Sequence, residues 1–321
     1  MKDNKFIFFL LLMVLLAYLF PEPGSPDSRI PLKTIGSIGI SMIFFFYGLK
    51  LSREKIRSGL RNLRLHLLIQ LSTFLLFPLI IMVFFPLMRN EYQHTLWLAV
   101  FFLAALPSTV SSSVVMVSLA KGNVPAAIFN ASLSGIIGIA VTPLWMGLFM
   151  QSQQGDYDFT QIYLKLFLEI ILPVALGLLL QPRWHALASK YSRQLTLFDK
   201  SVILLIVYKS FAESFYAGLF KDLGWGELGL LTALVIILFF VVYGTIYFLA
   251  TLLQFNREDR ITAVFCGTKK SLVHGTVFSN VLFGNAASAG IMLLPLMIFH
   301  AFQILTVSVI ATRYGTQVEE S

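Results

Sequence analysis

Pro107-Ser-Thr-Val-Ser-Ser-Ser113 interrupts an apolar stretch long enough to cross a lipid bilayer, and Gly267-Thr-Lys-Lys-Ser271 interrupts a second one in the other half of the chain. A Gly-Asn pair follows each interruption, at Gly122–Asn123 and at Gly284–Asn285. Broken helices in matching places of two half-chains are typical of the binding site of a secondary transporter. The two stretches therefore predict a membrane transporter with an internal repeat.

The composition requires a membrane. Of 321 residues, 57% are hydrophobic and only 12% are charged, which gives more apolar surface than a single core can bury. The apolar windows are about 20 residues long and lack the alternation of a membrane barrel, so we expect an all-α polytopic membrane protein. Ten windows of this kind predict transmembrane helices at residues 6–20, 32–50, 66–88, 95–119, 124–150, 159–181, 198–220, 228–254, 260–282 and 288–312.

Ten windows divide into two five-helix repeats, residues 1–150 and 151–321. Because five is odd, the second repeat enters the membrane in the opposite orientation, as inverted repeats require. The interruptions in windows four and nine would then meet near the bilayer centre, where unpaired backbone groups persist only inside protein or beside a watery cavity. Helix N-termini at such a point favour an anion, and C-termini favour a cation.

The positive charge follows the membrane topology. The formal net charge is +8, but the Lys and Arg residues cluster on one predicted side, with six of them between Lys50 and Arg64. The opposite side carries only Arg29, Lys33, Arg89 and Lys221. This bias predicts a protein of the cell inner membrane with both termini in the cytoplasm, and lipid rather than nucleic acid as its surroundings.

The first window has a second interpretation. Lys2 to Lys5 followed by a short apolar run is also typical of a signal peptide. The site after it, Tyr18-Leu-Phe-Pro-Glu22, lacks the small residues that a signal peptidase needs, and cleavage would leave nine spans. A retained first span is therefore the prediction.

Two adjacent lysines lie near the middle of window nine. An ammonium there costs at least about 2.5–3.5 kcal/mol, so we expect Lys269 or Lys270 to face a polar cavity, either holding an anionic substrate or standing in for a bound cation. His274 lies one turn beyond Lys270 and is either a proton relay or a histidine bonded to a neighbouring helix. In window seven, Lys209 and Glu213 are four residues apart and are expected to pair; alternatively, Glu213 carries a proton.

Neutral oxygens gather in windows four and five. Hydroxyl and amide oxygens of this kind suit a hard cation such as sodium, although hydroxyls in membrane helices more often bond the preceding turn. The single cysteine, Cys266, excludes an intramolecular disulfide and a zinc site built from several thiolates. No nucleotide-binding or hydrolase motif is present, so we expect no enzyme activity, no metal and no cofactor.

The chain resembles the bile acid:sodium symporter family, in the branch of sodium/bile acid cotransporter 7 and its bacterial homologues. The most specific stretches are Leu106–Ser113, Lys121–Asn130 and Phe265–Ser271. The resemblance implies ten spans with crossed, discontinuous helices four and nine. It also implies a core domain, residues 66–150 plus 228–312, that moves against a panel domain, residues 6–50 plus 159–220, with the substrate between them.

The departures from the family concern sodium. Where sodium-dependent members carry a glutamate and, four residues later, a glutamine as sodium ligands, this chain has Cys266 and Lys270. The resemblance therefore implies that the ammonium of Lys270 takes the place of a sodium ion, which leaves proton coupling or facilitated transport. The matching ligands on helix four are Ser112–Ser113 or Ser113–Val114.

The leading hypothesis is a secondary transporter of a small organic anion that works by alternating access, coupled to a proton or with sodium replaced by a lysine. The alternatives are a membrane regulator or solute sensor with the same fold, for example in ion homeostasis, and a channel. The substrate site is predicted at Ser108, Thr109, Thr268, Lys269, Ser271 and His274. The ion or ion-mimic site is predicted at Ser112, Ser113, Asn130, Ser134, Cys266 and Lys270, and the candidate proton carriers are Glu213 and His274.

Overall fold

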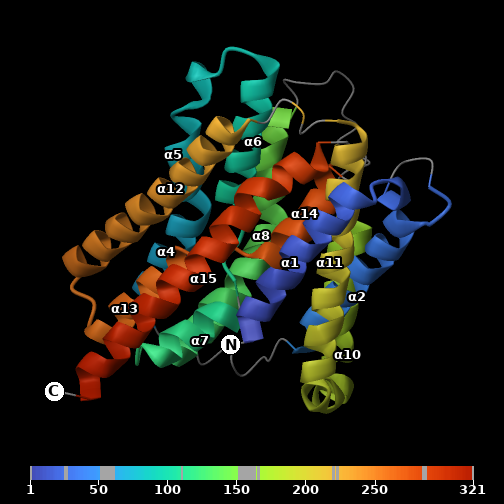
Figure 1. The fold of residues 1–321 in the computed structure, drawn as a ribbon. Helices are drawn as coiled ribbons and strands as arrows, with labels where there is room; N and C mark the ends of the chain where they lie inside the picture. Colours follow the sequence, from blue (N-terminus) through green and yellow to red (C-terminus); the bar gives the residue numbers. More distant parts are fainter. Residues whose placement is uncertain are drawn as a thin grey trace. The chain divides into compact units, whose positions relative to one another are not determined.

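The computed structural model of the protein describes residues 2–24, 28–50, 62–109, 111–150, 164, 167–218, 221, 224–283 and 288–319. Within these ranges all regular structure is helical and no strand occurs, as the composition predicts (Figure 1). The α-helices are α1 (Lys2–Leu19), α2 (Leu32–Lys50), α4 (Leu63–Leu71), α5 (Phe77–Met82), α6 (Glu91–Ala105), α7 (Ser111–Leu119), α8 (Val124–Met150), α10 (Leu172–Lys190), α11 (Ser192–Tyr216), α12 (Trp225–Leu252), α13 (Arg257–Gly267), α14 (Leu272–Phe283) and α15 (Ala289–Glu319).

Two short π-helical segments continue helices whose backbone a proline disturbs. η2 (Ser72–Leu76) leads into α5, and η4 (Phe167–Ile171) leads into α10. Two single 3-10 turns, η1 (Glu22–Gly24) and η3 (Phe85–Leu87), lie in connections between helices.

Six helical segments of the described chain are long and apolar enough to cross a bilayer, so the protein is a multi-pass membrane protein. The windows predicted at 32–50 and 124–150 coincide with α2 and α8. Windows four and nine are each divided into two shorter helices, and the apolar part of α1 is short. The full set of ten spans stays a prediction. The six segments are Leu32–Lys50, Leu63–Leu87, Val124–Met150, Phe167–Lys190, Trp225–Leu252 and Ala289–Thr316.

The chain forms two compact units. One comprises Met1–Ser52, Gly147–Gly224 and Gly275–Leu293, and the other comprises Arg53–Met146, Trp225–His274 and Leu294–Ser321. We call them unit one and unit two. The predicted repeats and the predicted core and panel domains stay predictions.

In unit one, small residues allow helices to approach closely. α2 contacts α10 and α11, and α1 contacts α11 (Figure 1). A Cβ built on Gly177 of α10 would lie 3.0 Å from the Cα of Gly48 of α2, so a larger side chain would force these backbones apart. Such close approach through glycine is typical of packed membrane helices.

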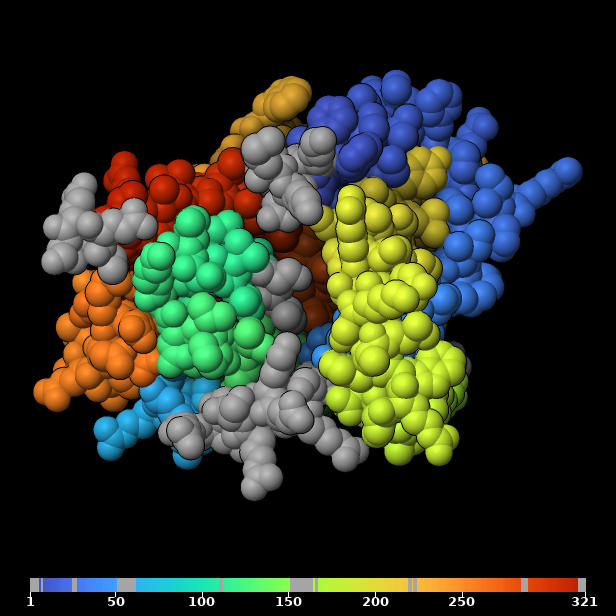
Figure 2. Space-filling view, turned by 90° about the horizontal axis from the view of Figure 1, so that it is seen from below, coloured from blue at the N-terminus to red at the C-terminus, as the bar shows by residue number. Residues whose placement is uncertain are grey.

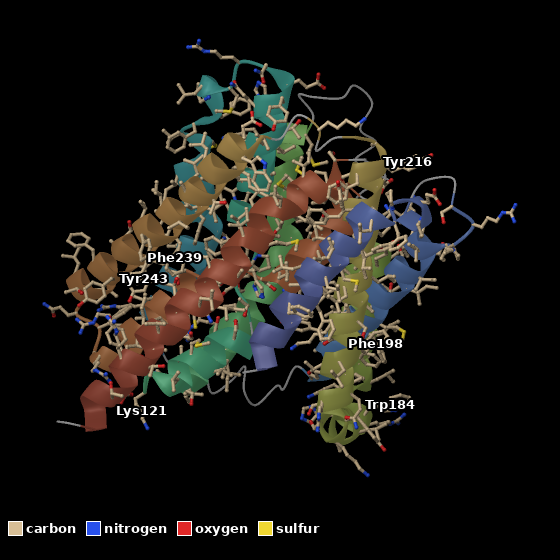
Figure 3. All side chains as sticks on the ribbon, viewed as in Figure 1. Lys121, Trp184, Phe198, Tyr216, Phe239 and Tyr243 are labelled. Atoms are coloured by element: carbon tan, nitrogen blue, oxygen red, sulfur yellow. The ribbon has the colours of Figure 1, made fainter. Side chains whose placement is uncertain are left out.

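In unit two, an aromatic cluster joins α5, α12 and α15. The ring centroid of Phe299 lies 6.1 Å from that of Phe77 and 5.9 Å from that of Phe239, and Phe239 lies 5.4 Å from Phe302. Phe239 and Tyr243 come from the same face of α12 (Figure 3). These edge-to-face contacts add to the burial of apolar area and hold the three helices together.

Helix caps hold the other end of unit two together. The Asn62 side chain caps α4 and also donates to the Asp259 carboxylate at 2.6 Å. The Asn123 side chain accepts from Ala126 at the start of α8 and donates to the other Asp259 oxygen at 2.8 Å. One carboxylate on α13 therefore fixes the first turns of two other helices. Figure 2 shows this face, with α7 and the start of α8 in green beside α13 in orange.

Candidate functional site

The first helix break leaves backbone carbonyls at the end of α6. The sequence predicts an interruption after Leu106, and the structure confirms it, since α6 ends at Ala105 and α7 begins at Ser111. Pro107 has no N–H to continue the helix, and the N–H of Ser108 donates instead to Ser134 Oγ at 2.9 Å. The carbonyls at the end of α6 need other donors.

A second orphan carbonyl comes from the π-helical segment η2. Its last turn has the i to i−5 pattern, because the N–H of Phe77 donates to the carbonyl of Ser72. The next bond of this pattern would run from residue 78 to Thr73, but residue 78 is a proline and has no N–H. The helix therefore leaves the Thr73 carbonyl without its expected donor.

Lys270 supplies the missing donors. Its Nζ lies 2.8 Å from the carbonyl oxygen of Thr73, 2.6 Å from that of Ala104 and 2.8 Å from that of Leu106. Three acceptors require three N–H groups, so the amine is an ammonium, and the side chain is fully buried. The Phe77 ring also lies under the ammonium, with its centroid 4.1 Å from Nζ.

The charge of Lys270 is balanced by dipoles rather than by a carboxylate. The ion pairs found in the described ranges are Lys50 with Asp199 and Lys209 with Glu213, and neither includes Lys270. The C-terminal end of a helix carries a partial negative charge, and here the end of α6 is directed at the ammonium. The result is a buried ammonium held by three carbonyl oxygens, a type of ligand that also suits a monovalent cation.

The second break meets the first through two hydrogen bonds to main-chain carbonyls. α13 ends at Gly267 and α14 begins at Leu272, as the sequence predicts. The N–H of Ser271 donates to the Pro107 carbonyl at 2.9 Å, and Ser108 Oγ donates to the Cys266 carbonyl at 2.6 Å. The two interruptions, more than 150 residues apart in sequence, therefore form one polar centre inside unit two.

A glutamine from α15 holds the second break. Lys270 N–H donates to Gln303 Oε1 at 3.0 Å, and Gln303 Nε2 donates to the Lys270 carbonyl at 2.8 Å. Gln303 is fully buried and its Nε2 also lies 3.0 Å from His300 Nδ1. Both backbone groups of Lys270 are thus satisfied although no regular helix continues there.

The predicted substrate residues are all buried at these breaks. Their hydroxyls have protein partners: Thr268 Oγ1 donates to the Val264 carbonyl at 2.7 Å, and Thr109 Oγ1 lies 2.7 Å from Ser112 Oγ. Ser271 Oγ accepts from the His274 N–H at 3.2 Å and lies 2.9 Å from His274 Nδ1, so it caps α14. A solute that contacts these hydroxyls must displace such bonds. The predicted substrate residues are Ser108, Thr109, Thr268, Lys269, Ser271 and His274.

The predicted ion-site oxygens divide into two groups. Cys266, through its carbonyl, and Ser134 both hold Ser108 at the first break. Asn130 lies in a separate network, where its Nδ2 is 2.7 Å from His66 Nδ1. Within the described ranges, the donors and acceptors bonded to Lys270 include none of the side-chain oxygens of Ser112, Ser113, Asn130 and Ser134, and the Ser113 hydroxyl is buried without a hydrogen-bond partner.

The Lys209–Glu213 pair lies in α11 of unit one. The two side chains are 2.5 Å apart and almost fully buried, which confirms the predicted pairing. Gly284–Asn285 and most of the loop from Lys50 to Arg64 lie outside the described residues.

The sequence did not point to Thr73, Phe77 or Gln303. Pro78 was the available signal for Thr73, since a proline inside an apolar window always frees a carbonyl. Gln303 is an uncharged polar residue in the last apolar window, and its partner could not be read from the sequence.

A multi-pass helical protein in which two broken helices meet around a buried cation has the architecture of a secondary transporter. The model of the SBF-like CPA transporter family matches residues 4–316, and the chain belongs to this family. This is a family of transporters, not of enzymes.

Named relatives agree with this assignment. The chain is 37% identical to the putative symporter YfeH of Escherichia coli over 317 residues, which cover 99% of this chain and 94% of the relative. It is 31% identical over 321 residues to sodium/bile acid cotransporter 7-B of Xenopus laevis, covering 97% and 91% of the two chains. It is 30% identical over 297 residues to sodium/bile acid cotransporter 7 of Mus musculus, covering 90% and 86%.

Proposed function

We propose that the protein is a secondary transporter of a small organic anion that works by alternating access. The observation that carries the proposal is the ammonium of Lys270 held by the carbonyls of Thr73, Ala104 and Leu106. Oxygen ligands at a helix C-terminus suit a coupling cation, and here a covalently attached cation fills the same role.

The anion is inferred from the charges and helix ends at the second break. Lys269 lies next to Lys270, and α14 begins one residue after Ser271, so its N-terminal partial positive charge is directed toward this region. Relatives named sodium/bile acid cotransporters suggest an organic anion as the solute. Lys269 then pairs with the anion, while Thr268, Ser108 and Thr109 offer hydroxyl hydrogen bonds.

The coupling ion follows from the same centre. A sodium ion can leave its site during the transport cycle, whereas the Lys270 ammonium cannot, so we infer transport without sodium. The driving force is then a proton, carried by His274 or Glu213, or the gradient of the solute itself. In this proposal the protein lies in the cell inner membrane with both termini in the cytoplasm, and its two repeats are inverted.

The test is ligand-dependent stability of the purified protein. Small carboxylates, sulfates and phosphates are screened by thermal unfolding with and without sodium, at about pH 5.5 and pH 7.5, on either side of the ordinary histidine pKa. A solute that raises the melting temperature of the wild type but not of Lys269→Met, independently of sodium, supports the proposal. Sodium-dependent stabilisation would overturn the cation-replacement role, and no stabilisation by any solute would favour a membrane regulator over a transporter.

A further inference from the structure

The orientation of the Gln303 amide is fixed by its backbone partners. The Lys270 N–H can only donate and the Lys270 carbonyl can only accept. Gln303 Oε1 must therefore face the N–H at 3.0 Å, and Nε2 must face the carbonyl at 2.8 Å. If the amide were flipped, its NH2 group would face the Lys270 N–H and its oxygen would face the Lys270 carbonyl. Donor would then meet donor, and acceptor would meet acceptor.

This orientation fixes the state of His300. The second N–H of Gln303 Nε2 is directed to His300 Nδ1, at 3.0 Å. Since Gln303 Nε2 is a donor, His300 Nδ1 must accept. The proton of the neutral His300 ring therefore lies on the other ring nitrogen. His300 is largely buried on α15, one turn before Gln303.

A proton on Nδ1 of His300 is incompatible with this arrangement. The new N–H would face the N–H of Gln303, which relieves the conflict only by flipping or withdrawing its amide. Either movement breaks both hydrogen bonds to the Lys270 backbone, and Lys270 lies in a segment without regular helix to replace them. The backbone that carries the buried ammonium would lose these two hydrogen bonds to α15.

We propose that His300 is a proton-binding site whose occupancy releases the Lys270 segment from Gln303. This inference deepens the proposed transport function and rests on it, because it identifies the residue through which a proton acts on the break. Gln303 is then a positioning residue, and His300 replaces His274 and Glu213 as the group that takes up the proton.

The charges near His300 also favour release of the Lys270 segment. On either side of His300, Phe299 contacts Phe77 of α5 and Phe239 of α12, and Gln303 contacts the break through Lys270. The titratable groups nearest in sequence to these contacts are Tyr243, one turn beyond Phe239 on α12, and the lysines at positions 269 and 270. Both charged groups are cations, so a proton on His300 adds repulsion near the break and favours its opening.

Cys266 provides a readout that does not depend on a solute. It is the single cysteine of the chain, it is buried, and it precedes the break by two residues. Its reaction with a maleimide in full-length protein in lipid nanodiscs measures how often the break opens. Because thiol reactivity itself changes with pH, the rate of each variant is divided by that of the wild type at the same pH.

The decisive variant is His300→Gln, whose side-chain oxygen accepts a hydrogen bond at any pH. We expect wild type and His300→Gln to label at similar rates at about pH 7.5. At about pH 5 the wild type should label about 30-fold faster, the factor expected for losing two buried hydrogen bonds. His94→Gln and His185→Gln are matched controls that should respond to pH as the wild type does. Equal rates at both pH values would overturn the proposal, as would loss of the pH response in His274→Gln with its retention in His300→Gln.

A second measurement, with a second variant, is used in case His300→Gln folds poorly. Hydrogen exchange of the peptide around residues 268–271, corrected for intrinsic exchange, should be faster in the wild type than in His300→Gln only at the lower pH. Gln303→Met should exchange fast at both pH values, and slow exchange in it would contradict the positioning role. Failure of the solute screen with a retained His300 response would reject the transporter and keep the proton site, so the two proposals fail separately.

Discussion

Replacing Lys270 with methionine tests whether the ammonium organises the helix breaks. Methionine has a similar length and fills the apolar volume, but it has no N–H, so the carbonyls of Thr73, Ala104 and Leu106 lose their donor. Each buried carbonyl left unsatisfied costs about 1–3 kcal/mol, or about 3–9 kcal/mol for three. Removing a charge from the membrane interior recovers about 2.5–3.5 kcal/mol. We therefore expect a net loss of stability of about 3 kcal/mol.

The assay is equilibrium unfolding in mixed micelles, with Lys121→Met as the matched control. Lys121 is exposed in the turn between α7 and α8 (Figure 3), so the same substitution there should change stability by less than about 0.5 kcal/mol. Sodium should restore part of the lost stability of Lys270→Met, because the vacated oxygens suit a hard cation, and should leave the wild type unchanged. A Lys270→Met variant as stable as the wild type and indifferent to sodium would refute the reasoning.

Three further predictions concern other parts of the structure, each measured by equilibrium unfolding. Lys209→Met should lower the stability by about 3–5 kcal/mol, because it leaves the Glu213 carboxylate buried without its partner. Adding Glu213→Gln to the same chain should restore most of this loss. A double variant no more stable than the single variant would contradict the prediction. Asp259→Ala should cost about 2–4 kcal/mol, since two capping amides lose a charged acceptor, and Asp259→Asn should cost roughly half as much. Gly290→Ala should cost about 1–3 kcal/mol, because its Cβ would meet a hydroxyl of α11 at 2.7 Å, whereas Gly226→Ala, with nothing within 4 Å, should be neutral.

The sequence predicts the location of the breaks well because the signals are local. A proline followed by serines, and two lysines inside an apolar window, are each incompatible with an ordinary membrane helix. The structure divides windows four and nine at these places, and it pairs Lys209 with Glu213 as their spacing predicts.

The sequence did not predict the ligands of Lys270, because these ligands are backbone atoms. A carbonyl is present at every residue, and only the π-helical register before Pro78 and the termination of α6 select the three that bind. The sequence predicted an ion site of hydroxyl groups such as those of Ser112 and Ser113, because residues differ in sequence only by their side chains. The Gln303 contact depends on how α15 lies against the break, which no spacing within the chain reveals.

The hydrogen bond from the Ser271 N–H to the Pro107 carbonyl has a consequence for mutagenesis. It joins main chain to main chain, so every side-chain replacement at Ser271 retains it, with the exception of proline. An alanine scan would therefore report only the loss of the Ser271 hydroxyl that caps α14, and not the contact that joins the two breaks. Homologous chains are equally free to vary their side chains here while keeping this connection, so variability at this position does not indicate that it is dispensable.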